Sequence, residues 1–292
     1  QKILKLGKIN LRTEIENKRV YPYKNIGSHI IGYVDIDNKG IAGIEGSYDN
    51  ILSQGNDINL TININLQNAI RDQLVDTIKK FSADSGSALV MDIKTSEILS
   101  INNFPDFDLN NIKNSNLDQR VNRILQSNYE MGSTFKPLTI AMGIDENLID
   151  KEMKFDVSKP IKNIITDWKK CDCYLSVKEI IVNSSNIGTA KIAKIIGKEN
   201  QINFFKKIGF FDPININLME IAKPFGQPYN WGSLETMTIG YGHGFAVTPL
   251  HLAVAYQAIL NDGKKTNPKI ILSDKNLEYS QIINKETSVY IS

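Results

Sequence analysis

The sequence predicts an α/β fold: a mainly antiparallel sheet with helices on both faces, an all-helical subdomain, and a smaller N-terminal part. Two short strands separated by a tight turn lie within residues 87–101, and amphipathic helical periodicity precedes and follows them. Residues 1–57 have a different, turn-rich pattern. With 292 residues, of which 41% are hydrophobic, the chain is long enough to bury a core.

The N-terminal part is predicted to be extended and rich in turns. Residues 1–20 alternate apolar and charged side chains, as an extended and half-buried segment does. Residues 30–34 (IIGYV) form a short strand candidate, and three glycines between residues 40 and 46 indicate turns. Residues 57–64 (DINLTINI) alternate with a period of two, which predicts a strand that enters the main domain.

The main domain is predicted to begin with a helix and a hairpin. Five apolar residues between 66 and 81 recur at spacings of three and four, which places them on one helical stripe. Residues 87–93 (SALVMDI) and 97–101 (EILSI) are predicted strands, and residues 94–96 form the turn between them. Residues 103–125 are polar and are expected to be mostly loop.

Helices are predicted for much of the remaining chain. One begins near Ser133, and a second begins at Ser176, which forms a capping box with the glutamate three residues later. A third helix over residues 187–196 is expected to end at Gly197 in a left-handed conformation. The last predicted helix opens with Thr248 as its cap, followed by proline at the first helical position.

Charge and hydropathy exclude two classes of protein. The formal net charge is only +2, so electrostatic binding of nucleic acid is not expected. No stretch approaches 18 uninterrupted apolar residues, so no membrane-spanning helix is predicted. The chain starts at Gln1 without the pattern of a signal peptide, and we expect it to begin inside a longer parent protein.

Cysteine and histidine do not predict a metal site. Cys171 and Cys173 are too close in sequence for the usual zinc-ligand spacing, and the three histidines are scattered. The two cysteines could form a disulfide or remain free thiols, and we expect free thiols.

The glycine-rich stretch 240–244 does not follow a strand of a βαβ unit, so no nucleotide site is expected there. His243 should be structural or at the surface. Both tryptophans are expected to be packing residues.

The clearest chemical pattern is S-x-x-K at Ser133 and Lys136. Three residues apart on a helix, these two side chains share one face. A serine hydroxyl becomes a good nucleophile when a base removes its proton, and a desolvated lysine can serve as that base. This spacing also occurs by chance, in which case Ser133 is a helix cap and Lys136 a surface lysine.

A second motif, S-x-N at Ser184 and Asn186, follows 51 positions after Ser133. It lies between two predicted helices, where a hydroxyl and a carboxamide can face a cleft. The hydroxyl can relay a proton, and the amide can hold a substrate carbonyl or the lysine. Taken alone, the motif is equally an ordinary polar turn between helices.

Together these motifs resemble the penicillin-binding proteins and serine β-lactamases, whose sites use S-x-x-K, S-x-N and K-T-G. The flanking sequence looks like class B penicillin-binding proteins over nearly the whole chain. The matching stretches are 28–52, 85–99, 129–137, 182–197 and 238–263. Within them, SSNIG followed by AKIA resembles the division-specific (septal) transpeptidases. The resemblance implies a transpeptidase fold for residues 58–292 and part of an N-terminal pedestal (dimerisation-like) domain for residues 1–57.

The resemblance also implies roles for individual residues. Ser133 would be the nucleophile that forms the acyl-enzyme, and Lys136 the general base that activates it. Ser184 and Asn186 would shuttle a proton and orient the substrate amide. The backbone N–H of Ser133 would form half of the oxyanion hole.

The third motif of the family, K-T-G, is absent from residues 1–292. Lys94-Thr95-Ser96 lies in the predicted hairpin turn, and Lys265-Thr266-Asn267 follows the last helix too soon and lacks the glycine. In the family the motif lies farther along the chain, so we expect it beyond Ser292. Residues 1–292 alone are therefore expected to acylate poorly or not at all, and to fold marginally.

The implied function is a peptidoglycan D,D-transpeptidase that cross-links stem peptides ending in D-Ala-D-Ala and is acylated by β-lactams. The implied partners are a septal glycosyltransferase and divisome proteins. The implied location is the periplasmic face of the inner membrane, with an anchoring helix upstream of residue 1. No metal or organic cofactor is implied. A serine β-lactamase or D,D-carboxypeptidase and a non-catalytic scaffold or sensor remain alternatives, although the pedestal-like residues 1–57 argue against a stand-alone hydrolase.

Overall fold

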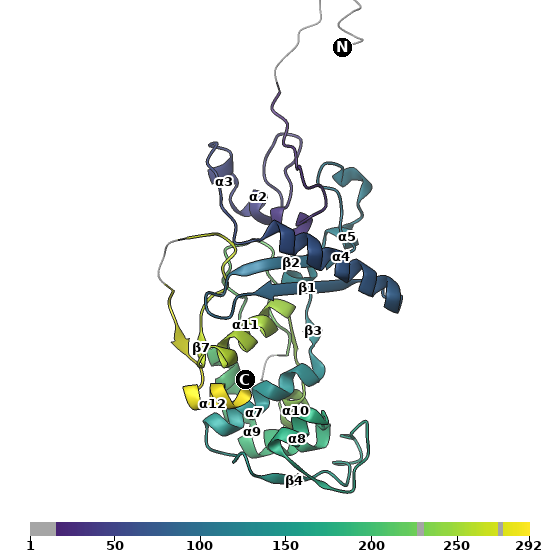
Figure 1. Cartoon of the computed structure of the whole chain (residues 1–292), viewed down its shortest axis with the longest axis vertical. Coiled ribbons are helices and arrows are strands. Elements are labelled where there is room, and N and C mark those ends of the chain that lie inside the picture. Colours follow the sequence, from purple (N-terminus) through teal and green to yellow (C-terminus); the bar gives the residue numbers. More distant parts are fainter. Residues whose placement is uncertain (1–15, 227–230, 274–276) are drawn as a thin grey trace, which may run out of the picture.

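The computed structural model describes residues 16–226, 231–273 and 277–292. Figure 1 shows three parts along the long axis: short helices at the N-terminal end, a β-hairpin with the long helix α4 above it, and a larger helical body below. The helices are α1 (Ser28–Ile31), α2 (Gly43–Ser47), α3 (Asp49–Leu52), α4 (Ile64–Phe81), α5 (Leu117–Arg120), α6 (Arg123–Gln126), α7 (Lys136–Asp145), α8 (Val177–Val182), α9 (Asn186–Ile208), α10 (Ser233–Gly240), α11 (Pro249–Leu260) and α12 (Lys285–Ile291). The strands and 3-10 turns are β1 (Gly86–Met91), β2 (Ile98–Phe104), β3 (Tyr129–Glu130), β4 (Lys154–Asp156), β5 (Tyr174–Ser176), β6 (Ala246–Val247), β7 (Lys264–Lys265), β8 (Ser280–Gln281), η2 (Ile112–Asn114) and η3 (Gly132–Phe135).

The hairpin of β1 and β2 occurs as predicted and forms a two-stranded sheet. The two strands pair antiparallel, with Ala88 opposite Asn102. Helix α4 lies on one side and binds β2 through the buried Gln67, whose side chain exchanges hydrogen bonds with the backbone of Ile101. Helix α11 lies on the other side (Figure 1) and contributes apolar side chains to the core beneath the hairpin. The prediction of an antiparallel sheet with helices on both faces is therefore confirmed for the described residues.

The predicted strand over residues 57–64 is not formed and is reduced to one isolated bridge. Leu60 pairs with Ile271, and the N–H of Thr61 donates to the carbonyl of Ile270 at 2.9 Å. The Asn63 side chain caps the first turn of α4 and so ends the extended segment. The alternation is nevertheless explained, since the backbone around Leu60 is paired.

The prediction for residues 30–34 is wrong. Residues 28–31 form the single helical turn α1, and Val34 has only an isolated bridge to Gly40. Gly27 and Gly32 flank the turn with φ of 74° each, and a short apolar run between two such glycines can fold either way. Residues 1–15 lie outside the described residues. Residues 16–20 are exposed and not half-buried as expected.

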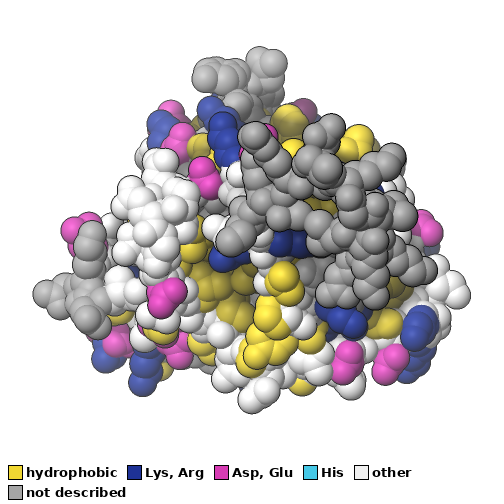
Figure 2. Space-filling view, turned by 90° about the horizontal axis from the view of Figure 1, so that it is seen from above, with side chains coloured by type: hydrophobic (Ala, Val, Ile, Leu, Met, Phe, Trp, Pro, Cys, Tyr) yellow, Lys and Arg dark blue, Asp and Glu magenta, His cyan; other side chains and the backbone are white. Residues whose placement is uncertain are grey.

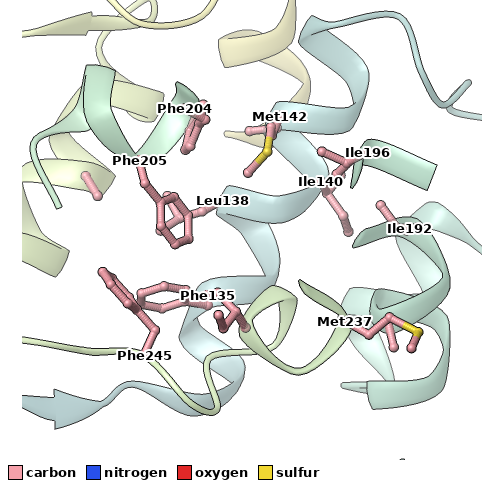
Figure 3. Close-up of a cluster of buried hydrophobic side chains, with 14 of the residues drawn as sticks. Phe135, Leu138, Ile140, Met142, Ile192, Ile196, Phe204, Phe205, Met237 and Phe245 are labelled. Carbon is pink, nitrogen blue, oxygen red and sulfur yellow. The ribbon is translucent and has the colours of Figure 1, made fainter. Parts of the chain in front are cut away.

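The helical body has its own hydrophobic core. Figure 3 shows Phe135, Phe205 and Phe245 close together beside helix α7, with edge-on and tilted ring contacts. Phe135 is fully buried and stacks on Phe210 with ring centroids 5.5 Å apart. Aliphatic and Met side chains from α7, α9 and α10 continue this core, among them Leu138, Ile140, Met142, Ile192, Ile196 and Met237. The residue that precedes Lys136 is thus fixed by aromatic packing.

The helix boundaries follow the predicted signals. The capping box of Ser176 is present at the start of α8, and the Thr248 side chain caps α11. Gly197 has the expected positive φ of 78° and a non-helical backbone, so the first helical segment of α9 ends there and a second one follows across a kink as far as Ile208. The second segment buries Phe204 and Phe205 in the same core.

Charged side chains of both signs lie on the N-terminal end of the molecule. Figure 2 views this end from above, and among the described residues basic and acidic side chains are interspersed with exposed hydrophobic ones. A mostly apolar cavity of about 330 Å³ lies at this end, with Ile30, Ile31, Ile62 and Ile64 among its lining residues. Among the described residues, no helix is both long and apolar enough to cross a membrane.

Candidate active site

Ser133 lies in the 3-10 turn η3, which runs directly into α7. The turn is held from both sides: the N–H of Gly132 donates to the carbonyl of Gly242 at 3.1 Å, and the Tyr256 hydroxyl donates to the carbonyl of Thr134 at 2.9 Å. As the second residue of the turn, Ser133 has an N–H with no partner inside the turn. Ser133 is exposed, so its hydroxyl is accessible to a substrate.

The glycine-rich stretch 240–244 packs against this turn. A Cβ on Gly242, whose φ is 80°, would come within 2.2 Å of the carbonyl oxygen of Gly132. Next to it, Glu130 accepts hydrogen bonds from the N–H of Gly244 at 2.9 Å and pairs with Nδ1 of His243 at 2.8 Å. Gly242 is therefore explained by close backbone approach, and His243 is at the surface, as expected.

Lys136 is the centre of the polar contacts behind Ser133. Its side chain is buried, with 2% of the residue exposed, although it begins helix α7. The Nζ atom donates to the Ser184 hydroxyl at 2.8 Å and to the Ser184 carbonyl, and the Ser184 hydroxyl is 2.9 Å from the Ser133 hydroxyl. Burial lowers the pKa of Lys136 to about 8, and the negative charge of Asp167 acts in the opposite direction.

Ser184 reaches Lys136 because its backbone is left-handed, with φ of 51°. This conformation is uncommon for a residue with a side chain, and such residues cluster at functional sites. It ends the turn after α8, so that both the hydroxyl and the carbonyl of Ser184 contact one ammonium group. Lys136, Ser184 and Ser133 therefore form one continuous chain of hydrogen bonds.

Asn186 is beside this chain and not part of it. It is the first residue of α9, and its Nδ2 donates to the carbonyl of Thr166 at 3.1 Å. Its Oδ1 accepts no hydrogen bond from any described residue, so the carboxamide does not hold Lys136. That oxygen is free to accept from a substrate amide.

The two other lysine–threonine pairs, Lys94-Thr95 and Lys265-Thr266, make their contacts away from Ser133. Lys94 is in the turn between β1 and β2, and its N–H donates to Asp92. The ammonium of Lys265 donates to the carbonyl groups of Lys207 and Ile208 at the end of α9. Among the described residues, none of the hydrogen bonds of either lysine includes Ser133, Lys136 or Ser184.

The segment between β4 and β5 was missed by sequence reasoning. Asp167 accepts from the Ser185 hydroxyl at 2.6 Å and from the N–H of Ile187 at 2.9 Å. It lies in a polar stretch without periodicity, and its partner Ser185 is the variable position of S-x-N. A serine there, next to an apolar helix start, indicates a helix cap but does not indicate which carboxylate it binds.

The same segment corrects two expectations. Cys171 and Cys173 form a disulfide and are not free thiols; with one residue between them, their Cα atoms are 5.2 Å apart, within the range that a disulfide spans. Trp168 is fully exposed and is not a packing residue, whereas Trp231 is buried against Phe205 and Phe245 as expected. Across the part of the chain that the structure describes, no group of three or more His, Cys, Asp or Glu side chains is placed to hold a metal ion.

Comparison with known proteins agrees with this geometry. The chain matches the penicillin binding protein transpeptidase domain over residues 86–290. It is 34% identical to the "Probable peptidoglycan D,D-transpeptidase FtsI" of Caulobacter vibrioides over 90% of this chain and 46% of that protein. It is 28% identical to the "Probable peptidoglycan D,D-transpeptidase PenA" of Neisseria gonorrhoeae over 90% of this chain and 51% of that protein. The chain thus spans about half the length of these curated relatives.

Two solved structures share the fold. The TP domain of penicillin-binding protein 3 from Burkholderia pseudomallei has a TM-score of 0.71 and 27% identity, over 80% of this chain and 68% of that one. Penicillin binding protein 3 from Mycobacterium tuberculosis has a TM-score of 0.82 at 20% identity, over 94% of this chain and 68% of that one. Because the family match covers well over half of its residues, this chain belongs to the penicillin-binding protein transpeptidase family and has that family's α/β fold.

Proposed function

We propose that this chain is the transpeptidase part of a division-specific class B penicillin-binding protein that cross-links peptidoglycan stem peptides through a serine acyl-enzyme. The observation that supports this most directly is the contact chain from Ser133 through Ser184 to the buried Lys136. Because burial lowers the pKa of Lys136 to about 8, about a tenth of its side chains are neutral at pH 7. A neutral amine beside a serine hydroxyl is what nucleophilic activation needs.

In the first half of the reaction, Ser133 Oγ attacks the carbonyl carbon of the penultimate D-Ala. Its proton passes to Ser184 Oγ, while the Ser184 proton passes to the neutral Nζ of Lys136. The Ser133 N–H donates to the oxygen that becomes negative, which lowers the energy of the tetrahedral intermediate. The peptide C–N bond then breaks, and the amine of the departing D-Ala takes a proton back along the same path.

In the second half, an amine of a neighbouring stem peptide attacks the acyl carbon. Lys136, neutral again, removes a proton from that amine, either directly or through Ser184. The bond between the acyl carbon and Ser133 Oγ breaks, and Ser133 is reprotonated. A β-lactam would acylate Ser133 by the first half of this sequence. Asn186, whose Oδ1 is free, would accept a hydrogen bond from the substrate amide.

The same proposal includes domains, partners and location. Residues 1–57 would belong to a pedestal domain and residues 58–292 to the transpeptidase domain. In support of a tight junction, Ile30 and Ile44 share a buried cluster with Ile98 of the hairpin. The protein would act at the periplasmic face of the inner membrane with septal glycosyltransferase and divisome partners, anchored by a segment upstream of residue 1.

The fate of the acyl group tests the function. The full-length protein, given a peptide that ends in D-Ala-D-Ala and an acceptor amine, is expected to release D-Ala and to form the cross-linked amide as its main product, measured by mass spectrometry. The Ser133→Ala variant should form neither. Hydrolysed peptide as the main product would identify a carboxypeptidase, and rapid hydrolysis of penicillin a β-lactamase. Absence of both D-Ala release and penicillin binding would identify a non-catalytic protein.

A further inference from the structure

The S-x-N turn is held from behind by the segment between β4 and β5. Three consecutive residues of the turn have three different partners: Ser184 contacts Lys136, Ser185 contacts Asp167, and Asn186 contacts the carbonyl of Thr166. Ser185 is almost completely buried, with 1% exposed, so its hydroxyl has little access to water. The position of Ser184 therefore depends on a residue that belongs to neither catalytic motif.

Asp167 holds the turn with both of its carboxylate oxygens. Its Oδ2 accepts from the Ser185 hydroxyl at 2.6 Å, and its Oδ1 accepts from the N–H of Ile187 at 2.9 Å. Ile187 is in the first turn of α9, where backbone N–H groups have no partner inside the helix and a negative charge is favourable. Ser185 in turn accepts from the N–H of Gly188. One carboxylate thus fixes both the turn and the helix that begins at Asn186.

Asp167 is also the charge that acts on Lys136. Its field raises the pKa of that lysine against the larger effect of burial. The atoms in direct contact with the ammonium, the hydroxyl and carbonyl of Ser184, are uncharged. On the neighbouring helices, the Glu179 carboxylate is bound to Ser176 at the start of α8, and Lys191 of α9 donates to the carbonyl of Asp156. Lys178 is exposed on α8.

We propose that Asp167 is a positioning residue for acylation, whose carboxylate holds the 184–186 turn against Lys136 and supplies the negative charge that acts on its ammonium. This inference rests on the proposed function only in taking acylation of Ser133 as the reaction. Asp167 touches neither Ser133 nor Lys136 through a hydrogen bond. It acts through Ser185 and through its charge, and the two effects can be separated by substitution.

Asp167→Asn removes the charge and keeps the size of the side chain. Penicillin acylation of the full-length protein should then begin its rise at lower pH than in the wild type, because the protonated form of Lys136 loses a stabilising charge. The rate at the high-pH plateau should fall by about tenfold, the scale of one lost charge-assisted hydrogen bond. Ser185→Ala removes the hydrogen bond and keeps the charge, so its plateau should fall without a shift of the midpoint.

Asp172→Asn is the matched control, since Asp172 is an exposed carboxylate of the same segment and makes no hydrogen bond with the 184–186 turn. Its midpoint and plateau should equal those of the wild type. Asp167→Glu keeps the charge and provides a second test if the Asn variant does not fold; its midpoint should stay near the wild-type value. Equal midpoints in Asp167→Asn and the wild type would overturn the proposal.

A titration of Lys136 that needs no reaction keeps this test separate from the function. In protein labelled with ¹³C-lysine, the ε-carbon signal that disappears in Lys136→Arg reports the protonation of Lys136. Its midpoint should move to lower pH in Asp167→Asn and not in Asp172→Asn. If the wild type is not acylated but the midpoint moves, the proposed function fails and the charge effect of Asp167 stands. An unmoved midpoint rejects the inference, whatever the acylation rate.

Discussion

Replacing Lys136 by arginine is expected to lower the rate of penicillin acylation by about a hundredfold or more, the general scale of acid–base contributions. Arginine keeps the positive charge but does not give up its proton in proteins, so it cannot act as a base. Lys136 contacts Ser184 and is buried, so a guanidinium would also have to fit into the same space. Stopped-flow acylation of the full-length protein measures the effect.

The rate of acylation of the wild-type protein should increase with pH, because Lys136 must lose its proton to act as the base. A base must be neutral, and burial lowers the pKa of Lys136 to about 8. Acylation should therefore rise as the pH passes through about 8 and then level off. Lys178→Arg, an exposed lysine of α8, is the control and should keep the wild-type rate and profile. A Lys136→Arg variant that acylates at a near-normal rate would show that another group is the base.

Replacing Phe135 by alanine should destabilise the fold by about 3–5 kcal/mol, the range for removal of a buried aromatic ring. Phe135 is completely buried and contacts Phe205 and Phe245 (Figure 3) as well as Phe210. Because it lies between Ser133 and Lys136 in sequence, loosening this ring should also slow acylation at temperatures where the protein stays folded. Thermal and denaturant unfolding measure the change in stability.

Phe81→Ala is the matched control for this prediction. Phe81 ends α4 and is 70% exposed, so its removal should change the free energy of unfolding by no more than about 0.5 kcal/mol. A Phe135→Ala variant that unfolds at the same denaturant concentration as Phe81→Ala would mean that the aromatic cluster does not stabilise the nucleophile turn.

Sequence patterns predicted the structure correctly where a few neighbouring residues determine the backbone conformation. The hairpin of β1 and β2, the capping box at Ser176 and the cap at Thr248 all occur as predicted. At both caps the partner is three positions along the chain, and the hairpin pairs two segments joined by one turn. The spacing of Ser133 and Lys136 likewise placed both side chains at one helix start.

Longer-range contacts explain what could not be predicted. The direction of α9 after Gly197 depends on Phe204 and Phe205 entering a core built from distant segments. The contact between Ser184 and Lys136 joins residues 48 positions apart, and its geometry depends on a left-handed serine that no local pattern indicates. Asp167 is recognised only when Ser185 and Ile187 are seen to face it. The roles assigned to the site residues stay predictions.

The measurement that tests the central claim most directly is the position of the penicillin adduct. The full-length protein is incubated with a fluorescent penicillin, digested, and sequenced by tandem mass spectrometry. We expect one adduct, on Ser133, and we expect Ser133→Ala to lose the label while its thermal unfolding stays close to that of the wild type. An adduct on any other residue, or undiminished labelling of Ser133→Ala, would contradict the assignment of Ser133 as the nucleophile.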